Sequence, residues 1–199
     1  MTDLDAVLAE ARACRHCEKH LPLGPRPVLR ASPSSRVLIV GQAPGTKVHE
    51  TGIPWNDASG DRLRDWLGVT RDVFYDEKFF AIVPMGFCYP GRQPRGGDNP
   101  PRPECAPMWH PRLRPLLPNV RLTLLVGSYA QAHYLGDRRG KTMTDTVRAF
   151  LDHLPAFLPT AFLPTPHPSW RTTHWIKKNP WFERELLPEL RSRICKIID

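Results

Sequence analysis

The chain has 199 residues, of which 41% are hydrophobic and 24% are charged, and its 28 basic and 20 acidic side chains give a formal net charge of +8. This composition excludes a disordered tail, and no apolar run reaches the roughly 18 residues that a membrane-spanning helix needs. The length predicts one domain over residues 1–199. The acidic N-terminal stretch lacks the basic start of a signal peptide, so we expect a cytoplasmic protein. We also expect it to be a monomer.

The positive charge consists mostly of arginine, whose planar guanidinium group can bind two phosphate oxygens at once. It therefore favours an acidic partner, although a genome with arginine-favouring codons gives the same composition.

Four short apolar runs predict four buried strands. They are rich in β-branched or leucine side chains, and two of them end directly in glycine, as is typical of a parallel sheet. The runs cover residues 36–40, 79–83, 122–126 and 161–164.

Helical patterns alternate with these strands. The predicted helices cover residues 3–20, 61–68, 108–117, 128–135 and 181–198, the last with a break possible at Pro188. The alternation predicts an α/β fold, a three-layer sandwich with a central, mostly parallel four-stranded sheet flanked by helices.

The segments that follow the predicted strands converge on one edge of this sheet. They are Gly41–Gly45, Pro84–Cys88, Gly127-Ser128 and His167–Ser169. Ligands of parallel α/β sheets bind at the carboxyl ends of the strands, so this edge is where we expect the site.

Two pairs of cysteines fall in irregular segments. Cys14 and Cys17 form a C-x-x-C pair, which is ambiguous between a metal site and a redox pair, and Cys88 and Cys105 lie in a proline-rich stretch. Four thiolates from two loops are what a zinc or iron–sulfur site requires. The alternative is that Cys88 and Cys105 are small buried apolar residues.

The remaining cysteine and two nearby histidines complete this set. The odd count of five and the lack of a secretion signal argue against a disulfide framework. We interpret Cys195 as a bystander, whereas His16 and His20 are possible substitute zinc ligands.

A polar and aromatic segment follows the first glycine-rich loop. Trp55 offers a flat face on which a planar base could stack, with Asn56 and Asp57 beside it. The alternative interpretation is structural: Trp55 belongs to the core, and Asp57 caps a helix that begins near Ser59.

The last strand leads into His167-Pro-Ser169, where a histidine can donate to a developing oxyanion or contact phosphate. Arginines, lysines and tryptophans alternate downstream, as on surfaces that bind phosphates and unstacked bases. The alternative is a solvated loop with aromatic anchors.

In this order the motifs resemble the uracil-DNA glycosylase superfamily, in particular its iron–sulfur bacterial and archaeal families four and five. The resemblance spans nearly the whole chain and rests on the C-x-x-C start, the Gly41–Gly45 loop, the stretch from Thr51 to Gly60, the Cys88 and Cys105 pair, and His167–Ser169.

The resemblance implies a role for each matching residue. A [4Fe-4S] cluster, with zinc or no metal as alternatives, would be held by Cys14, Cys17, Cys88 and Cys105. The pocket floor would be formed by Gly41, Gln42, Ala43, Pro44 and Gly45, with Trp55 stacking on a flipped uracil. Asp57 would aid the attack of water and His167 would steady the departing base. Ser169, Arg171 and His174 would contact DNA.

Two departures from the family pattern bear on mechanism. Gln42 stands where family four has an acid, and no asparagine precedes Cys88 to read the edge of uracil, which leaves backbone groups, Asn56 or His49 for that task. The chain is therefore nearer to family five or to a branch of its own.

The implied activity is hydrolysis of the N-glycosidic bond of uracil, or of another deaminated base, in DNA. Two other functions stay open: a non-catalytic protein that binds uracil or abasic DNA, and a zinc-stabilised nucleic-acid-binding module.

Overall fold

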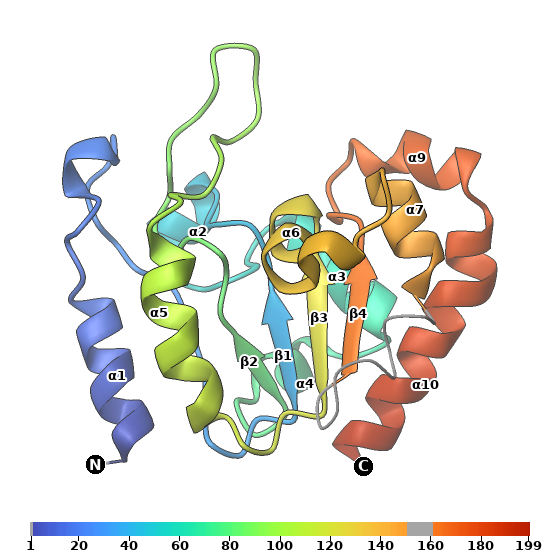
Figure 1. The fold of residues 1–199 in the computed structure, drawn as a ribbon, viewed down its shortest axis with the longest axis horizontal. Coiled ribbons are helices and arrows are strands. Elements are labelled where there is room, and N and C mark those ends of the chain that lie inside the picture. Colours follow the sequence, from blue (N-terminus) through green and yellow to red (C-terminus); the bar gives the residue numbers. More distant parts are fainter. Residues whose placement is uncertain (1, 151–160) are drawn as a thin grey trace.

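The computed structural model describes residues 2–150 and 161–199, and a four-stranded sheet lies at its centre (Figure 1). The strands are β1 (Val37–Val40), β2 (Phe80–Ile82), β3 (Leu122–Val126) and β4 (Ala161–Thr165). All three pairings are parallel, in the order β2-β1-β3-β4, and Ile39 of β1 pairs with Ile82 on one side and Leu124 on the other. The predicted strands and their parallel pairing are confirmed.

Helices precede, connect and follow the strands. In chain order they are α1 (Asp3–Arg12), η1 (Glu18–His20), α2 (Thr46–Thr51), α3 (Ala58–Leu67), α4 (Arg71–Tyr75), α5 (Cys105–Leu113), η2 (Arg114–Leu116), α6 (Ser128–Leu135), η3 (Gly136–Arg138), α7 (Met143–Arg148), α9 (Thr172–Lys178), the π-helical η4 (Phe182–Leu186) and α10 (Leu187–Ile198).

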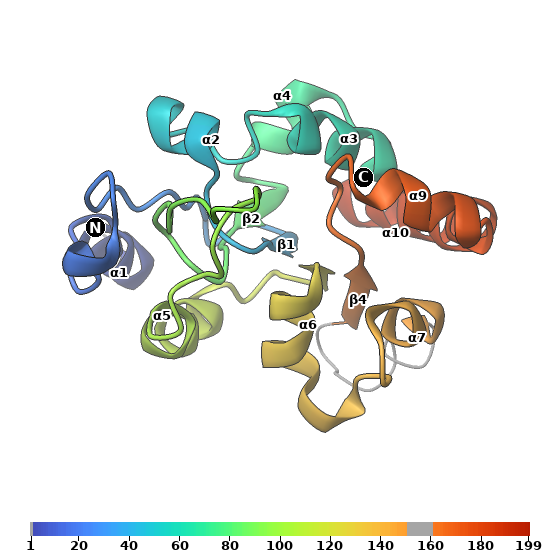
Figure 2. The ribbon, with the colours of Figure 1, turned by 90° about the horizontal axis from the view of Figure 1, so that it is seen from above.

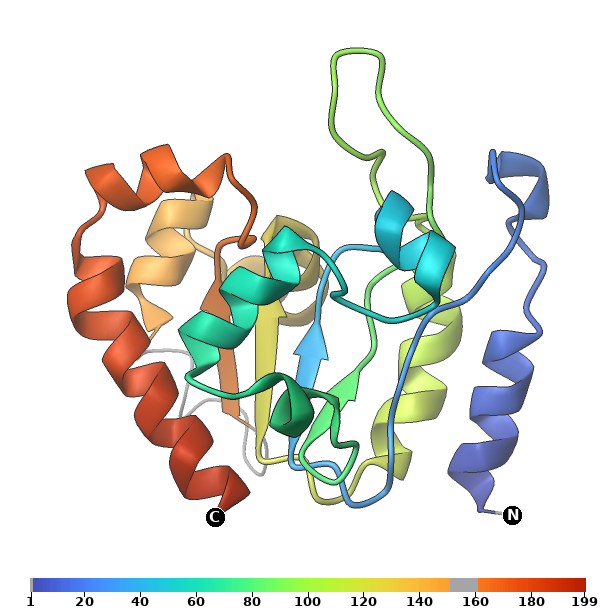
Figure 3. The ribbon, with the colours of Figure 1, turned by 180° about the vertical axis from the view of Figure 1, so that it is seen from behind.

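Both faces of the sheet are covered, because successive strand side chains point to opposite faces. Leu38 and Val40 pack with α1, α5 and α6, whereas Val37 and Ile39 pack with α3, α4 and α10. The view from above shows these two helical layers on either side of the strands (Figure 2), and the view from behind shows α3 and α4 crossing the second face (Figure 3). The predicted three-layer sandwich is confirmed.

The predicted helix over residues 3–20 is wrong in length. α1 ends at Arg12, and Cys14 and Cys17 lie in the turns between α1 and η1. The apolar stripe of the helix ends at Ala11, and beyond it no buried side chain holds the chain in helical form.

The short helices α2, α4, α7 and α9 were not predicted. Each has five to seven residues, which is too short for an apolar repeat to be visible in a window of about 11–18 residues. At the C-terminus, Pro188 lacks a backbone N–H, and the helix widens into the π-helical η4 just before it.

The strand order places a topological switch point beside β1. The chain moves from β1 outward to β2 and then crosses back to β3 on the other side of β1. Crevices at such points are where open α/β sheets bind ligands. Across residues 2–150 and 161–199, no helix is both long and apolar enough to span a bilayer.

Candidate active site

A cavity of about 710 Å³ opens at the carboxyl edge of the sheet. Four segments line it: the loop after β1, the stretch from Pro54 to Ser59, the hairpin of residues 91–99 between β2 and α5, and the loop after β4. From the predicted site it contains Gly41, Gln42, Ala43, Pro44, Gly45, Trp55, Asp57, His167, Ser169 and Arg171. Of the four strand-end segments that the sequence predicts to converge, Gly41–Gly45, Pro84 and His167–Ser169 line this cavity, whereas Gly127-Ser128 does not and only its glycine packs against His167.

Glycines allow the floor of this cavity to be tightly packed. A Cβ atom on Gly41 would lie 2.7 Å from Cζ2 of Trp55, so only glycine lets the indole lie against the backbone there. Gly127, which follows β3, lies beneath His167: a Cβ atom on it would make only ordinary contact with Cβ of His167 at 3.6 Å, and its φ of 85° is what favours glycine there.

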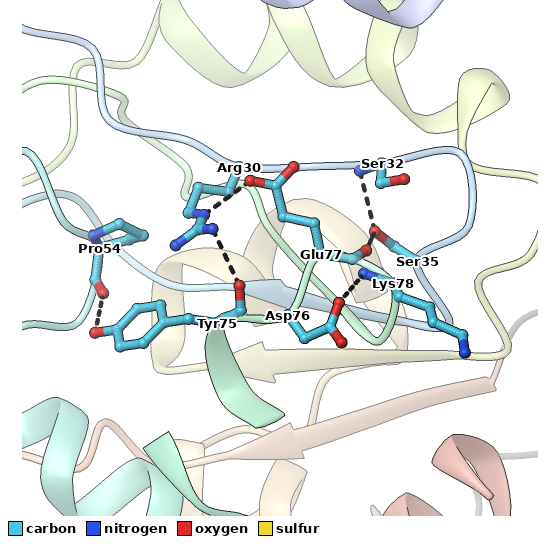
Figure 4. Close-up of polar contacts among 8 residues, drawn as sticks. All are labelled: Arg30, Ser32, Ser35, Pro54, Tyr75, Asp76, Glu77 and Lys78. Carbon is cyan, nitrogen blue, oxygen red and sulfur yellow. Dashed lines mark hydrogen bonds and ion pairs between the residues drawn. The ribbon is translucent and has the colours of Figure 1, made fainter. Parts of the chain in front are cut away.

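The backbone at Trp55 is held in a strained conformation. Among the described residues, Trp55 is the one non-glycine residue with a positive φ, at 57°. Nη1 of Arg64 donates to the Trp55 carbonyl oxygen at 3.2 Å, and the Tyr75 hydroxyl donates to the Pro54 carbonyl oxygen at 2.8 Å (Figure 4). Arg64 itself is only 6% exposed and lies over the ring of Phe74. A strained backbone of this kind persists only where the surrounding structure holds it in place. Here the held backbone sets the position of the Trp55 indole.

Gly60 is the residue of α3 that packs against this strained segment, and we expect its replacement by alanine to destabilise the protein. A Cβ atom there would lie 1.7 Å from the Trp55 carbonyl oxygen, so the backbone must move. Glycine to alanine within a helix normally stabilises by up to about 1 kcal/mol, whereas overpacking here predicts a loss of about 1–3 kcal/mol.

Urea denaturation of Gly60→Ala measures this loss. Asp65→Ala, on the exposed face of the same helix, is the matched control and is expected to change the free energy of unfolding by no more than about 0.5 kcal/mol. A Gly60→Ala protein as stable as the wild type would contradict the contact.

Trp55, His167 and Asp57 form the chemical centre of the cavity. The indole and imidazole ring centroids are 5.5 Å apart, with the planes tilted by 32°. Burial lowers the pKa of His167, which favours the neutral imidazole, and the negative charge of Asp57 acts in the opposite direction.

Asp57 combines the structural and functional interpretations of the sequence. Its Oδ1 accepts the Gly60 N–H at 2.8 Å as the N-cap of α3, which begins at Ala58. Asp57 also lines the cavity and acts electrostatically on both His167 and Asp98. Capping therefore fixes where the carboxylate stands without removing it from the site.

The rim of the cavity is formed by the loop after β4 and by a hairpin, the tall light-green loop of Figure 1. The backbones of Arg92 and Asp98 form an antiparallel β-bridge across this hairpin, and both residues line the cavity. Arg171 reaches it from the other side, because Nη1 of Arg171 lies 2.6 Å from where a Cβ atom of Gly97 would be. Within the described part of the chain, Arg92, Arg95 and Arg171 form no close ion pair, although Arg92 and Arg171 act electrostatically on Asp98.

Three predicted site residues lie outside the cavity lining. Asn56 accepts a hydrogen bond on Oδ1 from Arg71 at 2.9 Å, His49 packs near Tyr89, and His174 is exposed on α9. The sequence interpretation missed Asp98, Arg92 and Lys47, which do line the cavity. The signal for the first two is the length of the proline-rich segment from 84 to 107, which is too long for an idle connection.

The four predicted cysteine ligands lie around a second, small cavity of about 20 Å³. Cys14, Cys17, Cys88 and Cys105 all line it, and the Phe87 N–H donates to Sγ of Cys105 at 3.4 Å. Burial raises the pKa of Cys88 to about 11 and that of Cys105 to about 12, and in both cases nearby cysteines add to the rise. Cys195 is exposed on α10, away from this pocket.

As they stand, no three His, Cys, Asp or Glu side chains in residues 2–150 and 161–199 are arranged to hold a metal ion. The chemistry of the four donors nevertheless fits a soft, sulfur-liganded group, because thiolates select zinc, copper(I) or iron–sulfur clusters.

Comparison with protein families decides which fold family this is. The model of the Uracil DNA glycosylase superfamily matches residues 30–191, most of the chain, including the whole sheet and all residues that line the large cavity except Val28. The chain belongs to the uracil DNA glycosylase superfamily.

Proposed function

We propose that this member of the superfamily is a monofunctional DNA glycosylase that removes uracil, or another deaminated base, and leaves an abasic site. The observation that carries the proposal is the placement of Trp55, His167 and Asp57 in one cavity with a glycine floor. Such a cavity can hold a single flat ring, with the indole and the imidazole packed together in its wall.

The base must first leave the helical stack, at a cost of a few kcal/mol. Stacking on Trp55 offsets part of this cost, since base–aromatic stacking contributes about 1–3 kcal/mol. Contacts of Arg92, Arg95 and Arg171 with phosphates contribute more, and their contribution falls as salt rises because binding releases counterions.

Hydrolysis then passes through a sugar with oxocarbenium character, and the base departs with negative charge. The carboxylate of Asp57 stabilises the positive sugar. Neutral His167 donates a hydrogen bond to the oxygen of the departing base where negative charge develops. Both groups are fixed before the substrate enters, Asp57 by capping α3 and His167 by packing against Trp55.

An excision screen tests this function. Each oligonucleotide of a panel carries one uracil, hypoxanthine or xanthine, in single- and double-stranded form, and alkali-labile breaks are measured. We expect breaks at uracil or at another deaminated base. Binding to these oligonucleotides without breaks for any base would instead indicate a non-catalytic damage-binding protein.

We propose further that Cys14, Cys17, Cys88 and Cys105 hold a [4Fe-4S] cluster. The support is the set of four sulfurs around one small cavity, with a backbone N–H donated to one of them. When bound, the cluster would tie the turns after α1 to both ends of the segment from Cys88 to Cys105. This role is structural and involves no redox chemistry.

Replacing Cys88 with serine is expected to remove the iron–sulfur absorption of the purified protein and to lower its melting temperature. Cys195→Ser is the matched control and is expected to change neither property, because Cys195 lies on α10. Iron and sulfide analysis with absorption spectroscopy measures the result. Stoichiometric zinc in a colourless wild-type protein would contradict the cluster.

A further inference from the structure

The water that attacks the sugar needs a group to take its proton, and the first motif does not supply one. Gln42 stands in the loop after β1, and an amide is not a base. One carboxylate oxygen of Asp57 already accepts the Gly60 N–H. Another carboxylate, Asp98, lines the same cavity from the hairpin and has no hydrogen bond to its side chain within the described residues.

The base of the hairpin is built so that Asp98 is held over the first motif. The Asn99 N–H donates to the Gly91 carbonyl oxygen at 2.9 Å, which closes the hairpin directly after Asp98. Nε2 of Gln42 donates to the Asn99 carbonyl oxygen at 3.2 Å, which ties the hairpin to the loop after β1. As a result, Oδ2 of Asp98 lies 3.3 Å from where a Cβ atom of Gly45 would be.

This arrangement gives Gln42 a purpose that an acid could not fulfil. The Asn99 carbonyl oxygen needs a donor, which the amide of Gln42 provides and an ionised carboxylate does not. Position 42 thus carries no carboxylate, but its amide helps to position the carboxylate of Asp98 in the same cavity.

We propose that Asp98 is the catalytic base that activates water for attack on the sugar. The inference rests on the proposed glycosylase function. A water held by Asp98 transfers a proton to the carboxylate as its oxygen bonds to C1′. The bond from C1′ to the base nitrogen breaks, and its electron pair leaves with the base. The base anion, stabilised by His167, later takes up a proton, so that the net reaction is addition of water.

The charges around Asp98 suit this role. Partial burial raises the pKa of Asp98 and Asp57 adds to the rise, whereas Arg92 and Arg171 oppose it. A carboxylate with a raised pKa is a better proton acceptor. The side chain is exposed to solvent, from which the water enters.

Single-turnover excision from a uracil oligonucleotide tests the proposal. Asp98→Asn is expected to lower the rate by about 100- to 10,000-fold, the range for losing a general base, with unchanged affinity for an oligonucleotide that carries an abasic analogue. Asp98→Glu is expected to keep part of the wild-type rate. Asp137→Asn, which changes an exposed acid on η3, is the control and is expected to keep all of it. In Asp98→Asn the acidic limb of the pH–rate profile is expected to lose the ionisation of Asp98 and to keep that of His167.

Two results overturn the proposal in distinguishable ways. If the wild type excises uracil and Asp98→Asn does so at the same rate, or loses only affinity, Asp98 is not the base and the glycosylase function stands. If the wild type binds the oligonucleotides but excises no base, both proposals fail together.

Discussion

Replacing Asp57 with asparagine is expected to lower single-turnover excision about 100- to 1,000-fold while leaving the stability of the protein unchanged. Asparagine caps helices as well as aspartate, so its Oδ1 still accepts the Gly60 N–H at the start of α3. What is lost is the negative charge that faces the sugar. Rapid-quench excision assays and urea denaturation measure the two quantities separately.

Asp57→Ala serves as the comparison, because it removes the cap together with the charge. Its unfolding free energy is expected to fall by about 1 kcal/mol, with a loss of excision at least as large as that of the asparagine variant. Wild-type excision by Asp57→Asn would show that Asp57 is only a helix cap.

Replacing His167 with alanine is expected to lower excision by about 100- to 1,000-fold, the usual effect of removing one preorganised donor to a developing oxyanion. His174→Ala, on the exposed side of α9, is the control and is expected to have little effect on the chemical step. Single-turnover rates at saturating enzyme measure both variants. Full activity of His167→Ala would remove His167 from the mechanism.

The pH dependence tells which form of His167 acts. Burial lowers its pKa below the ordinary value of 6.5, so the neutral form predominates at pH 7 and above. If the neutral form is the active one, its contribution is lost only as the pH falls through this lowered pKa. We therefore expect no decline in rate from pH 7 to pH 8. A decline over that range, absent from His167→Ala, would indicate that the imidazolium is the active form.

The sheet could be predicted from the sequence because each strand is a short apolar run followed by a chain reversal. Residues 122–126 match β3 at both ends, and the other three strands match within a residue or so. The short helices could not be predicted in the same way, since α4 and α7 depend on a threonine cap and on contacts with the sheet rather than on an apolar repeat.

The candidate site could be predicted where residues follow a strand directly, as Gly41–Gly45 and His167 do. Asp98 could not, because its position depends on the hairpin and on the hydrogen bond from Gln42, which link residues far apart in the sequence. The same holds for Asn56, whose hydrogen bond to Arg71 lies outside the cavity. Its position next to Trp55 in the sequence suggested that Asn56 faces the cavity, whereas the turn of the backbone at Trp55 directs its side chain elsewhere.

The segment from Cys88 to Cys105 begins and ends at the cysteine pocket, while its middle overhangs the large cavity. Its ends are thus fixed independently of its tip. Lengthening such a loop costs little, since each doubling of its length adds only about 0.6 kcal/mol of closure entropy. The tip from Arg92 to Gly97 is therefore the part of the molecule where insertions can reshape the entrance, and with it the range of admitted bases, without disturbing the sheet beneath.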